Sequence, residues 1–321
     1  MAVTGRDEAH LHLRVRRHDA AAEGVVVLEL EHPSSDPLPS WSPGAHVDLC
    51  LPNGLIRQYS LCGSPADLST YRFGILREPA SRGGSSYIAD EVAAGAVIEV
   101  KGPRNHFPLL PAESYIFIAG GIGITPLLPM IDAAQAAGVP WELHYGGRSR
   151  ASMGFLDEIA TLPDGRVRLY PQDEVGLIDL ASVLGEHRPG SLVYSCGPGS
   201  LLEAIEERTA LWPEGCVHME RFEPKEFDEP VSTESFEVEL ADTGTVLVVP
   251  PDKSVLEVLR DADVEVYSSC QDGTCGTCET TVLAGEVEHR DSIMSAEEQA
   301  ANDRMYICVS RAACPRLVLE L

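Results

Sequence analysis

Basic side chains are scarce in this sequence. Its 321 residues include 24 Lys and Arg against 50 Asp and Glu, which gives a formal net charge of −26. Nucleic acids are bound mainly through their phosphates, and that requires a basic surface which this composition does not supply. The composition therefore argues against a nucleic-acid-binding protein and favours a partner with a basic surface.

Long apolar runs are also missing. No stretch provides the roughly 18 uninterrupted apolar residues of a membrane span. Residues 1–10 alternate small and charged side chains, without the apolar core of a secretion signal. We therefore expect a cytoplasmic protein without a membrane partner. Its length fits two or three domains, each with its own core.

The nine cysteines do not resemble a disulfide framework, because their number is odd and no secretion signal precedes them. Cys270, Cys275 and Cys278 form a C-x4-C-x2-C pattern, and Cys308 follows after 29 residues. This is the plant-type spacing for a 2Fe-2S cluster. Small residues and glycines in 268–278 allow backbone N–H groups to approach the sulfurs. Zinc is the alternative, but it usually needs two C-x2-C pairs, and only one is present.

The other five cysteines share no such spacing, and buried cysteine commonly acts as a small apolar residue. Cys314 follows Cys308 closely and is its rival as the fourth cluster ligand. Cys196 stands in a glycine motif discussed below. The five are Cys50, Cys62, Cys196, Cys216 and Cys314.

The C-terminal part predicts a small α+β domain around the cysteine loop. Alternating apolar residues indicate strands, and a serine stands where a helix should begin. In order, we expect strands at 236–240 and 245–249 joined by a turn at 241–244, a helix at 255–261 capped by Ser254, the cysteine loop, and a strand at 317–319.

This order of elements resembles the plant-type ferredoxin fold, over residues 232–321. The acidic, proline-bearing stretch 223–231 is interpreted as a linker. Residues 232–321 contain 18 acidic and 6 basic side chains, so this domain carries a net charge of −12. Such a charge is either a solvated surface or a docking face for a basic partner.

The middle of the chain predicts an α/β domain with a parallel sheet. An apolar strand at 115–119 enters a glycine turn, and a helix follows. Glycines allow the backbone to approach a pyrophosphate, and the start of the helix attracts the anion. Further strands are expected at 141–145, 167–170 and 191–195, with helices at 155–159 and 200–208; the last of these helices follows the turn Cys196-Gly197-Pro198-Gly199.

The first hundred residues contain short strand-like stretches separated by Pro and Gly. This spacing predicts an antiparallel β-barrel. The stretches lie around 11–15, 24–31, 46–51, 71–76 and 96–101.

Two further motifs add a resemblance that covers nearly the whole chain: Arg57-Gln58-Tyr59-Ser60-Leu61 and Arg82-Gly83-Gly84-Ser85. With the order of the three parts, they resemble the phthalate dioxygenase reductase family, which includes vanillate O-demethylase reductases. The resemblance implies a multidomain chain. Its parts are an FMN-binding antiparallel β-barrel at 1–108, an NAD-binding α/β domain with a parallel sheet at 109–222, a linker at 223–231 and a plant-type 2Fe-2S ferredoxin domain at 232–321.

In that family the R-x-Y-S-L strand binds the flavin. The resemblance implies that Arg57 reaches the phosphate, Tyr59 flanks the ring system and Ser60 lies near its N5 atom, with Gln58 and Leu61 in the same strand. No separate adenine platform is evident, which favours FMN over FAD. Backbone contacts to the flavin are implied for Gly74, Ile75 and Leu76, and phosphate contacts for Arg82, Gly83, Gly84 and Ser85.

The resemblance likewise implies an NADH site. Arg148 and Arg150 stand where related reductases bind the adenosine end, and arginines there could accept a 2′-phosphate, but the family favours NADH. The residues implied near the nicotinamide and the reacting ring are Ser60, Thr125, Cys196 and Phe222. For Phe222 a core position at a strand end is the alternative. The pyrophosphate and ribose contacts implied are Gly120, Gly121, Gly123, Thr125 and Pro126, and the nicotinamide contacts are Cys196, Gly197 and Pro198.

These cofactors predict an NADH-dependent oxidoreductase. NADH gives up two electrons together, whereas a 2Fe-2S cluster accepts one, so a flavin is needed between them. The resemblance implies the reductase component of an oxygenase system, with a Rieske non-haem iron oxygenase acting on an aromatic compound as the electron acceptor. A bacterial cytochrome P-450 is the alternative acceptor, and a non-catalytic redox sensor is an alternative of another class. We expect a monomer.

Overall fold

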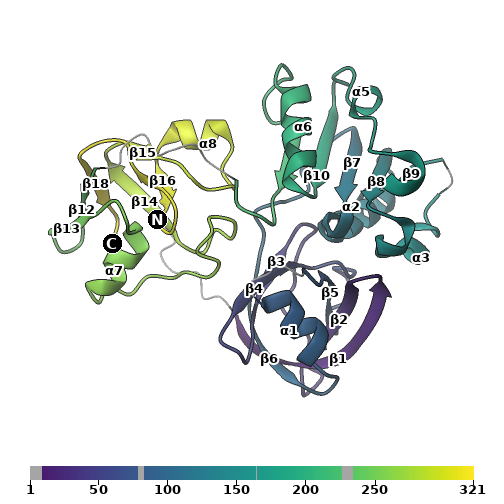
Figure 1. Cartoon of the computed structure of the whole chain (residues 1–321), viewed down its shortest axis with the longest axis horizontal. Helices are drawn as coiled ribbons and strands as arrows, with labels where there is room; N and C mark the ends of the chain where they lie inside the picture. The colour runs from purple at the N-terminus through teal and green to yellow at the C-terminus, as the bar shows by residue number, and fades with distance from the viewer. Residues whose placement is uncertain (1–8, 79–82, 164, 226–233) are drawn as a thin grey trace. The chain divides into compact units, whose positions relative to one another are not determined.

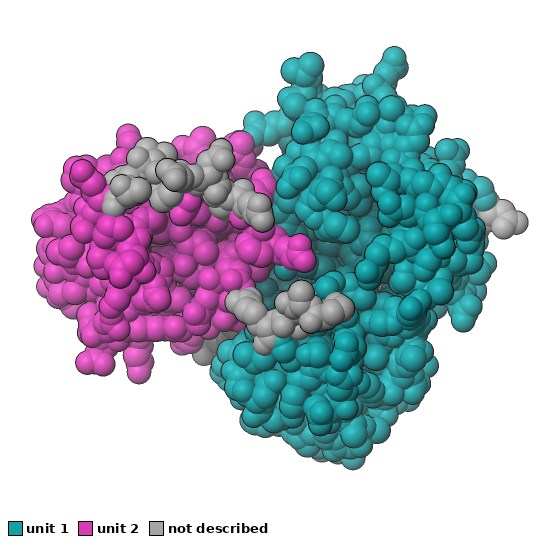
Figure 2. Space-filling model, in the orientation of Figure 1, with its two compact units in different colours: residues 1–222 teal, residues 223–321 magenta. Residues whose placement is uncertain are grey.

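The computed structural model describes residues 9–78, 83–163, 165–225 and 234–321 (Figure 1). Contacts divide the chain into two compact units, Met1–Phe222 and Glu223–Leu321 (Figure 2). Of the described helices, none is both long enough and apolar enough to cross a membrane.

The first unit begins with a six-stranded antiparallel sheet in the order β4-β3-β6-β1-β2-β5. Alternate side chains, such as Leu13 and Val15, are buried in a common core, and the end strands β4 and β5 approach each other. The five strand-like stretches and the predicted flavin strand all lie in this sheet, and its antiparallel order is consistent with the expected layout. Its strands are β1 (His10–Ala22), β2 (Val25–Glu31), β3 (His46–Cys50), β4 (Ile56–Ser60), β5 (Thr70–Leu76) and β6 (Val97–Arg104), and α1 (Gly84–Glu91) follows β5.

The second sheet of this unit is parallel throughout, in the order β11-β10-β7-β8-β9. Its strands are β7 (Ser114–Gly120), β8 (Trp141–Gly147), β9 (Val167–Pro171), β10 (Ser191–Cys196) and β11 (Val217–Glu220). The helical segments are η1 (Gly121–Gly123), α2 (Ile124–Ala136), η2 (Arg150–Ser152), α3 (Leu156–Ile159), α4 (Gln172–Val175), α5 (Leu180–Val183) and α6 (Gly199–Thr209).

Both faces of the parallel sheet are covered, which explains why its central strand is apolar without alternation. In β7, Tyr115 and Phe117 face the core that includes α2, whereas Ile116 and Ile118 face the core that includes α5 and α6. All five loops at the carboxyl ends of the strands therefore meet at one edge, where ligands of such sheets bind.

The predicted start of the helix at 155–159 was wrong by one residue. The sequence predicted a helix from Phe155, but Phe155 adopts a left-handed backbone with φ +62°, and the helix begins at Leu156. The strand β11 was not expected, because its four residues are only half buried and show no clear period.

The second unit is a five-stranded mixed sheet in the order β13-β12-β18-β14-β16, with a short pair β15-β17 beside it. Ser254 caps α7 as expected, and its hydroxyl and Glu257 form a reciprocal capping box. The elements are β12 (Phe236–Leu240), β13 (Thr245–Val249), α7 (Val255–Asp261), β14 (Glu279–Ala284), β15 (Val287–Glu288), α8 (Ala296–Ala301), β16 (Arg304–Tyr306), β17 (Arg311–Ala312) and β18 (Arg316–Leu319).

Candidate functional site

The predicted flavin strand is β4, at one end of the antiparallel sheet. Tyr59 is partly buried, and desolvation raises the pKa of its hydroxyl. The amide of Gln58 donates to Asp48 Oδ1 at 3.0 Å, and Arg104 donates to the same atom at 2.6 Å. The side chain of Gln58 is therefore engaged within the sheet. Leu61, directly after the strand, is fully buried and donates its N–H to Ala45.

The start of α1 lies against Arg57. A Cβ on Gly84 would come within 2.5 Å of Arg57 Cγ, so only glycine leaves room for this side chain. Gly83 precedes the helix with φ +89°, and no described side chain caps the first turn. The Ser85 hydroxyl accepts the Glu78 N–H at 3.1 Å. Arg82, the other predicted phosphate contact, lies outside the described residues.

The remaining predicted flavin contacts are in β5, the other end strand of the sheet. Ile75 points into the core, and its backbone and that of Gly74 pair with β2 on one side only. Leu76 lines a pocket of about 390 Å³ together with Arg148, Arg77 and Glu23. The pocket thus joins a predicted flavin residue to a predicted adenosine residue.

At the carboxyl edge of the parallel sheet, two glycine turns touch each other. A Cβ on Gly120 would lie 2.6 Å from Pro198 Cδ, and one on Gly123 would lie 2.2 Å from the Cys196 carbonyl oxygen. A Cβ on Gly197 would lie 2.9 Å from Gly120 Cα. The two turns that the sequence predicted to bind the coenzyme are therefore brought together, and glycine is required for their contact.

The helices after these turns begin without a side-chain cap. Neither α2, which follows Gly123, nor α6, which follows Pro198, has one, whereas serines cap α7 and α8. Thr125 uses its hydroxyl to donate to Ile122 O at 3.0 Å, and Pro126 has no N–H. A Cβ on Gly121 would meet nothing within 4 Å. Uncapped N–H groups beside an open backbone suit a pyrophosphate.

The two sheets of the first unit meet at the predicted reacting residues. The Ser60 hydroxyl donates to Glu220 Oε2 at 3.2 Å, and Glu220 lies opposite Cys196 in the register of β10 and β11. A Cβ on Gly74 would lie 2.8 Å from the Thr125 methyl. Residues predicted to bind flavin thus stand beside residues predicted to bind the coenzyme.

The carboxyl of Glu220 is placed where its charge is disfavoured. Loss of surrounding water raises its pKa to about 8, although the hydrogen bond from Ser60 acts in the opposite direction. Desolvation also raises the pKa of the Cys196 thiol well above its ordinary value. Both groups are therefore mainly neutral at pH 7.

Three predicted residues lie at the margins of this site. Arg150 forms an ion pair with Glu174 at 3.2 Å. Arg148 lines the pocket described above. Phe222 has 42% of its surface exposed, so it is not a core residue at the end of a strand.

The cysteine loop of the second unit gathers the four predicted ligands. The neighbouring thiols of Cys275 and Cys308 lower the pKa of Cys270, and Cys270 and Cys278 both lie beside Cys308. The backbone N–H of Asp272 points to Cys270 Sγ at 3.3 Å, and that of Thr277 points to Cys275 Sγ at 3.4 Å. Convergent sulfurs with N–H donors fit an iron-sulfur cluster.

Cys314 does not join this group. Its sulfur contacts the backbone of Glu286 and Arg316 instead. Within the described ranges, no set of three or more His, Cys, Asp and Glu side chains has the compact arrangement of a single-ion site.

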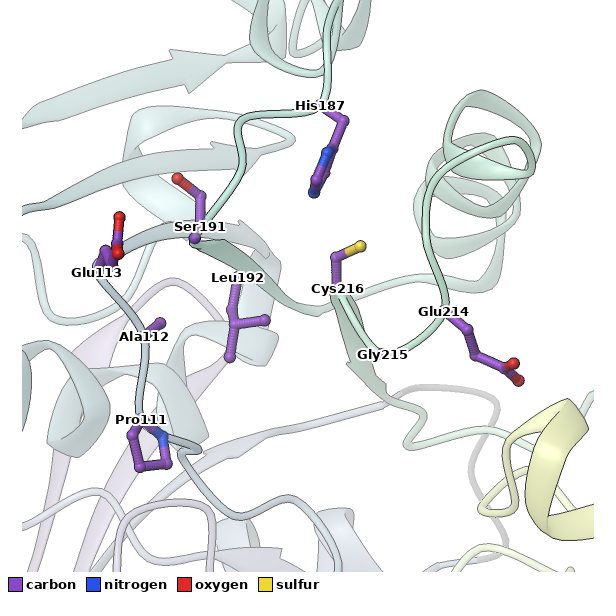
Figure 3. A pocket seen from close by; sticks show the side chains of 10 residues that line it. Pro111, Ala112, Glu113, His187, Ser191, Leu192, Glu214, Gly215 and Cys216 are labelled. Atoms are coloured by element: carbon purple, nitrogen blue, oxygen red, sulfur yellow. The ribbon is translucent and has the colours of Figure 1, made fainter.

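A second pocket lies at the opposite edge of the parallel sheet, near the amino ends of β7 and β10. Its volume is about 520 Å³. Figure 3 shows the His187 ring and the Cys216 thiol facing the same hollow, with Glu113 and Glu214 at its sides. The coenzyme turns are at the other end of these strands, so this pocket is not part of the predicted site.

Comparison with known proteins agrees with this arrangement. Residues 238–313 match the family of 2Fe-2S iron-sulfur cluster binding domains. The chain is 42% identical to the phenoxybenzoate dioxygenase subunit beta of Ectopseudomonas oleovorans, over 98% of each chain. The structure of phthalate dioxygenase reductase, described as modular for electron transfer from pyridine nucleotides to [2Fe-2S], matches with 37% identity and a TM-score of 0.70, over 97% of this chain and 98% of that one.

A third match is to a larger protein. An intact type IV self-sufficient cytochrome P450 monooxygenase matches 97% of this chain with 44% identity and a TM-score of 0.91. This chain spans only 41% of the length of that protein.

The chain belongs to the phthalate dioxygenase reductase family. The predicted cofactors, FMN, NADH and a 2Fe-2S cluster, are those of the family and are confirmed. The predicted class is also confirmed: the protein is an NADH-dependent flavin and iron-sulfur oxidoreductase that serves an oxygenase system. A non-catalytic redox sensor is thereby set aside.

Two residues at the site were missed by sequence reasoning. Glu220 precedes Phe222 by two residues, and only the aromatic was considered there. A carboxylate at the carboxyl end of a sheet strand was the available signal. Phe155 was assigned to a helix, although its ring packs against Gly74.

The raised pKa of Glu220 predicts a pH-dependent step. Below about pH 8 the carboxyl is neutral, and above it the carboxylate is negative beside Ser60. A negative charge there opposes the arrival of electrons at a neighbouring flavin, so NADH-dependent flavin reduction should slow as pH rises through 8, by roughly tenfold. Stopped-flow measurement from pH 6 to about 9.5 checks this. In the Glu220→Gln variant, the inflection near pH 8 in the plot of reduction rate against pH should vanish. An unchanged inflection would mean that another group titrates there.

Proposed function

We propose that this protein is the reductase component that delivers electrons from NADH, through FMN and a 2Fe-2S cluster, to a Rieske non-haem iron oxygenase acting on an aromatic compound. Two observations carry the proposal. The alignment with a dioxygenase subunit covers 98% of this chain and 98% of that subunit. In addition, the residues proposed to bind flavin meet those proposed to bind NADH. The proposal includes a monomer located in the cytoplasm, where NADH is formed.

The proposed domains are an FMN-binding barrel at 1–108, an NAD-binding domain at 109–222, a linker at 223–231 and the ferredoxin domain at 232–321. The antiparallel sheet lies within 1–108, and the parallel sheet lies within 109–222. The division of the chain into two compact units after Phe222 supports a domain boundary at that point. Most of the proposed linker lies outside the described residues.

FMN is proposed to bind between β4, β5 and the start of α1. The phosphate would lie at the uncapped first turn of α1, where Arg57 packs on Gly84 and supplies positive charge. Tyr59 would flank the ring system, and Ser60 would hydrogen-bond near its reacting edge. Bound FMN would accept two electrons from NADH and release them singly. The other proposed contacts are Gln58, Leu61, Gly74, Ile75, Leu76, Arg82, Gly83 and Ser85.

NADH is proposed to bind along the carboxyl edge of the parallel sheet. Its pyrophosphate would lie at the uncapped start of α2, and its nicotinamide would lie at the turn of Cys196, beside Ser60. Neutral Cys196 and Glu220 leave this region without charge at pH 7. The other proposed contacts are Gly120, Gly121, Gly123, Thr125, Pro126, Arg148, Arg150, Gly197, Pro198 and Phe222.

The cluster is proposed to be bound by Cys270, Cys275, Cys278 and Cys308. Their convergence supports this set, and the separate contacts of Cys314 argue against the rival. The N–H groups of the loop would stabilise the negative charge of the cluster sulfurs.

A cytochrome P-450 is the second candidate acceptor. The observation that favours it is the TM-score of 0.91 with the self-sufficient P450 monooxygenase, compared with 0.70 for phthalate dioxygenase reductase. The Rieske proposal is preferred because the dioxygenase relative is matched along its whole length, whereas the P450 protein is matched over 41%.

Electron delivery to isolated acceptors tests the proposal. The purified reductase and NADH are mixed with a panel of Rieske oxygenases and of P450 haem domains, and acceptor reduction is followed spectroscopically. We expect reduction of a Rieske centre, with a rate that falls as salt screens the −12 charge of residues 232–321 over a Debye length of about 8 Å. Reduction of P450 haem alone would transfer the proposal to the second candidate.

Separate serine substitutions at Cys308 and Cys314 test the ligand assignment. Cys308→Ser should remove or destabilise the cluster, because a neutral hydroxyl is a poor substitute for a thiolate on iron. Cytochrome c reduction should then collapse, while ferricyanide reduction, which can draw electrons directly from flavin, should persist. Cys314→Ser is the matched control and should retain both activities. The reverse pattern would show that Cys314 is the ligand.

The pairing of Arg150 predicts a preference for NADH over NADPH. A 2′-phosphate would meet the carboxylate of Glu174, and Arg150 is already bound to that carboxylate. Glu174→Gln should raise kcat/KM for NADPH by roughly two- to fivefold, the size expected for exposed charges, and leave that for NADH nearly constant. Glu207→Gln, at an exposed position in α6, is the control. No change in NADPH efficiency would mean that Arg150 does not face the adenosine end.

A further inference from the structure

The turn that carries Phe155 is attached firmly to the parallel sheet. Gly154 accepts a hydrogen bond from the Tyr145 hydroxyl at 3.3 Å, and Met153 packs so closely on Gly147 that a Cβ there would lie 2.4 Å from Met153 Cγ. Phe155 itself has φ +62°, a left-handed conformation that residues with a Cβ rarely adopt. Such a backbone outlier is maintained only where the surrounding structure requires it.

The Phe155 ring leaves its own sheet and packs on the proposed flavin domain. Only 4% of the residue is exposed. A Cβ on Gly74, in β5, would lie 2.6 Å from both Cε2 and Cζ of this ring. The same Cβ would lie 2.8 Å from the Thr125 methyl at the start of α2. The ring and the methyl thus cover the one place in β5 that has no side chain.

A second contact fixes the ring from the side. The Arg72 guanidinium lies 5.1 Å from the centroid of the Phe155 ring, and Arg72 donates two hydrogen bonds to Glu158, one of them at 2.8 Å. Glu158 is in α3, directly after Phe155. Nearby, the Glu23 N–H donates to Ala151 O at 2.8 Å. These contacts hold residues 151–158 against β5 and against the turn between β1 and β2.

We propose that Phe155 is a positioning residue for hydride transfer, because it sets the separation between β5 and the start of α2. This inference rests on the proposed placement of FMN along Gly74 and of NADH at Thr125. Transfer of hydride depends steeply on the distance between the reacting atoms, so that a displacement of about 1 Å costs roughly a hundredfold in rate. Phe155 touches neither reacting group in this account and acts through Gly74 and Thr125.

A double-mutant cycle between Gly74 and Phe155 tests the proposal. Gly74→Ala puts a methyl group where the ring lies, so the two elements must move apart. Phe155→Leu removes the ring atoms that this methyl would meet. We expect Gly74→Ala to slow single-turnover flavin reduction by at least tenfold, and the double variant to recover part of that loss, because the Thr125 methyl still lies 2.8 Å from the added carbon. KM for NADH and the dissociation constant of NAD⁺ should change less than the rate.

The same truncation at Phe117 is the matched control. Phe117 is fully buried in β7, and its contact is with Tyr115 rather than with Gly74. Phe117→Leu should lower the melting temperature but should give no rate recovery when combined with Gly74→Ala. Phe155→Met is a second truncation, which maintains the test if the leucine variant does not fold.

Melting temperatures of the flavin-free proteins give a readout that is independent of activity. Recovery of both melting temperature and hydride-transfer rate in the double variant supports the positioning role. Recovery of melting temperature alone shows an ordinary packing contact and overturns it, as does recovery of neither. If the wild-type protein does not bind FMN, the proposed function fails instead, and the melting temperatures still report the contact between Phe155 and Gly74.

Discussion

Close approach of two backbones is the constraint on which this structure depends. Hydride passes only between rings in contact, so the strand ends proposed to bind the two rings must carry no side chains in the way. Gly120, Gly123 and Gly197 meet this need within the parallel sheet, where added Cβ atoms would collide with neighbouring atoms. Gly74 meets it between the two sheets. At each of these positions a neighbouring atom leaves no room for a Cβ, and the φ angle itself does not require glycine.

Charge is arranged around the same contact. Helices α1 and α6, and the η1 turn that leads directly into α2, begin without side-chain caps, which leaves backbone N–H groups for the phosphates of the two proposed nucleotides. Between those ends, Glu220 and Cys196 have pKa values raised by burial and remain neutral. In the second unit, the N–H groups of Asp272 and Thr277 face sulfurs. Fixed dipoles thus stand where negative charge is expected, and the two acidic side chains beside the proposed ring contact are mainly neutral at pH 7.

The sequence was most informative where local chemistry decides structure. The capping box of Ser254, the hairpin of β12 and β13 and the C-x4-C-x2-C spacing all depend on residues close together in the chain, whereas β14, β15, β16 and β17 were not predicted. It was least informative where distant segments meet. The left-handed turn at Phe155 is imposed by packing against β5. The raised pKa of Glu220 arises from desolvation at the meeting of two sheets, where its hydrogen-bond partner Ser60 is 160 residues away in the sequence. Gln58 belongs to the flavin motif, yet its side chain binds Asp48, which sequence spacing cannot reveal.

Family membership settles the cofactors and the class of reaction, and the geometry explains why they fit this chain. The central claim is that one chain takes up electrons in a pair and releases them singly. Anaerobic titration with NADH measures this most directly, with flavin and iron-sulfur absorption followed together. Full reduction should consume about 1.5 equivalents of NADH per chain, because FMN accepts two electrons and the cluster accepts one. Saturation at about one equivalent, with the flavin bleached and the iron-sulfur absorption unchanged, would contradict the account.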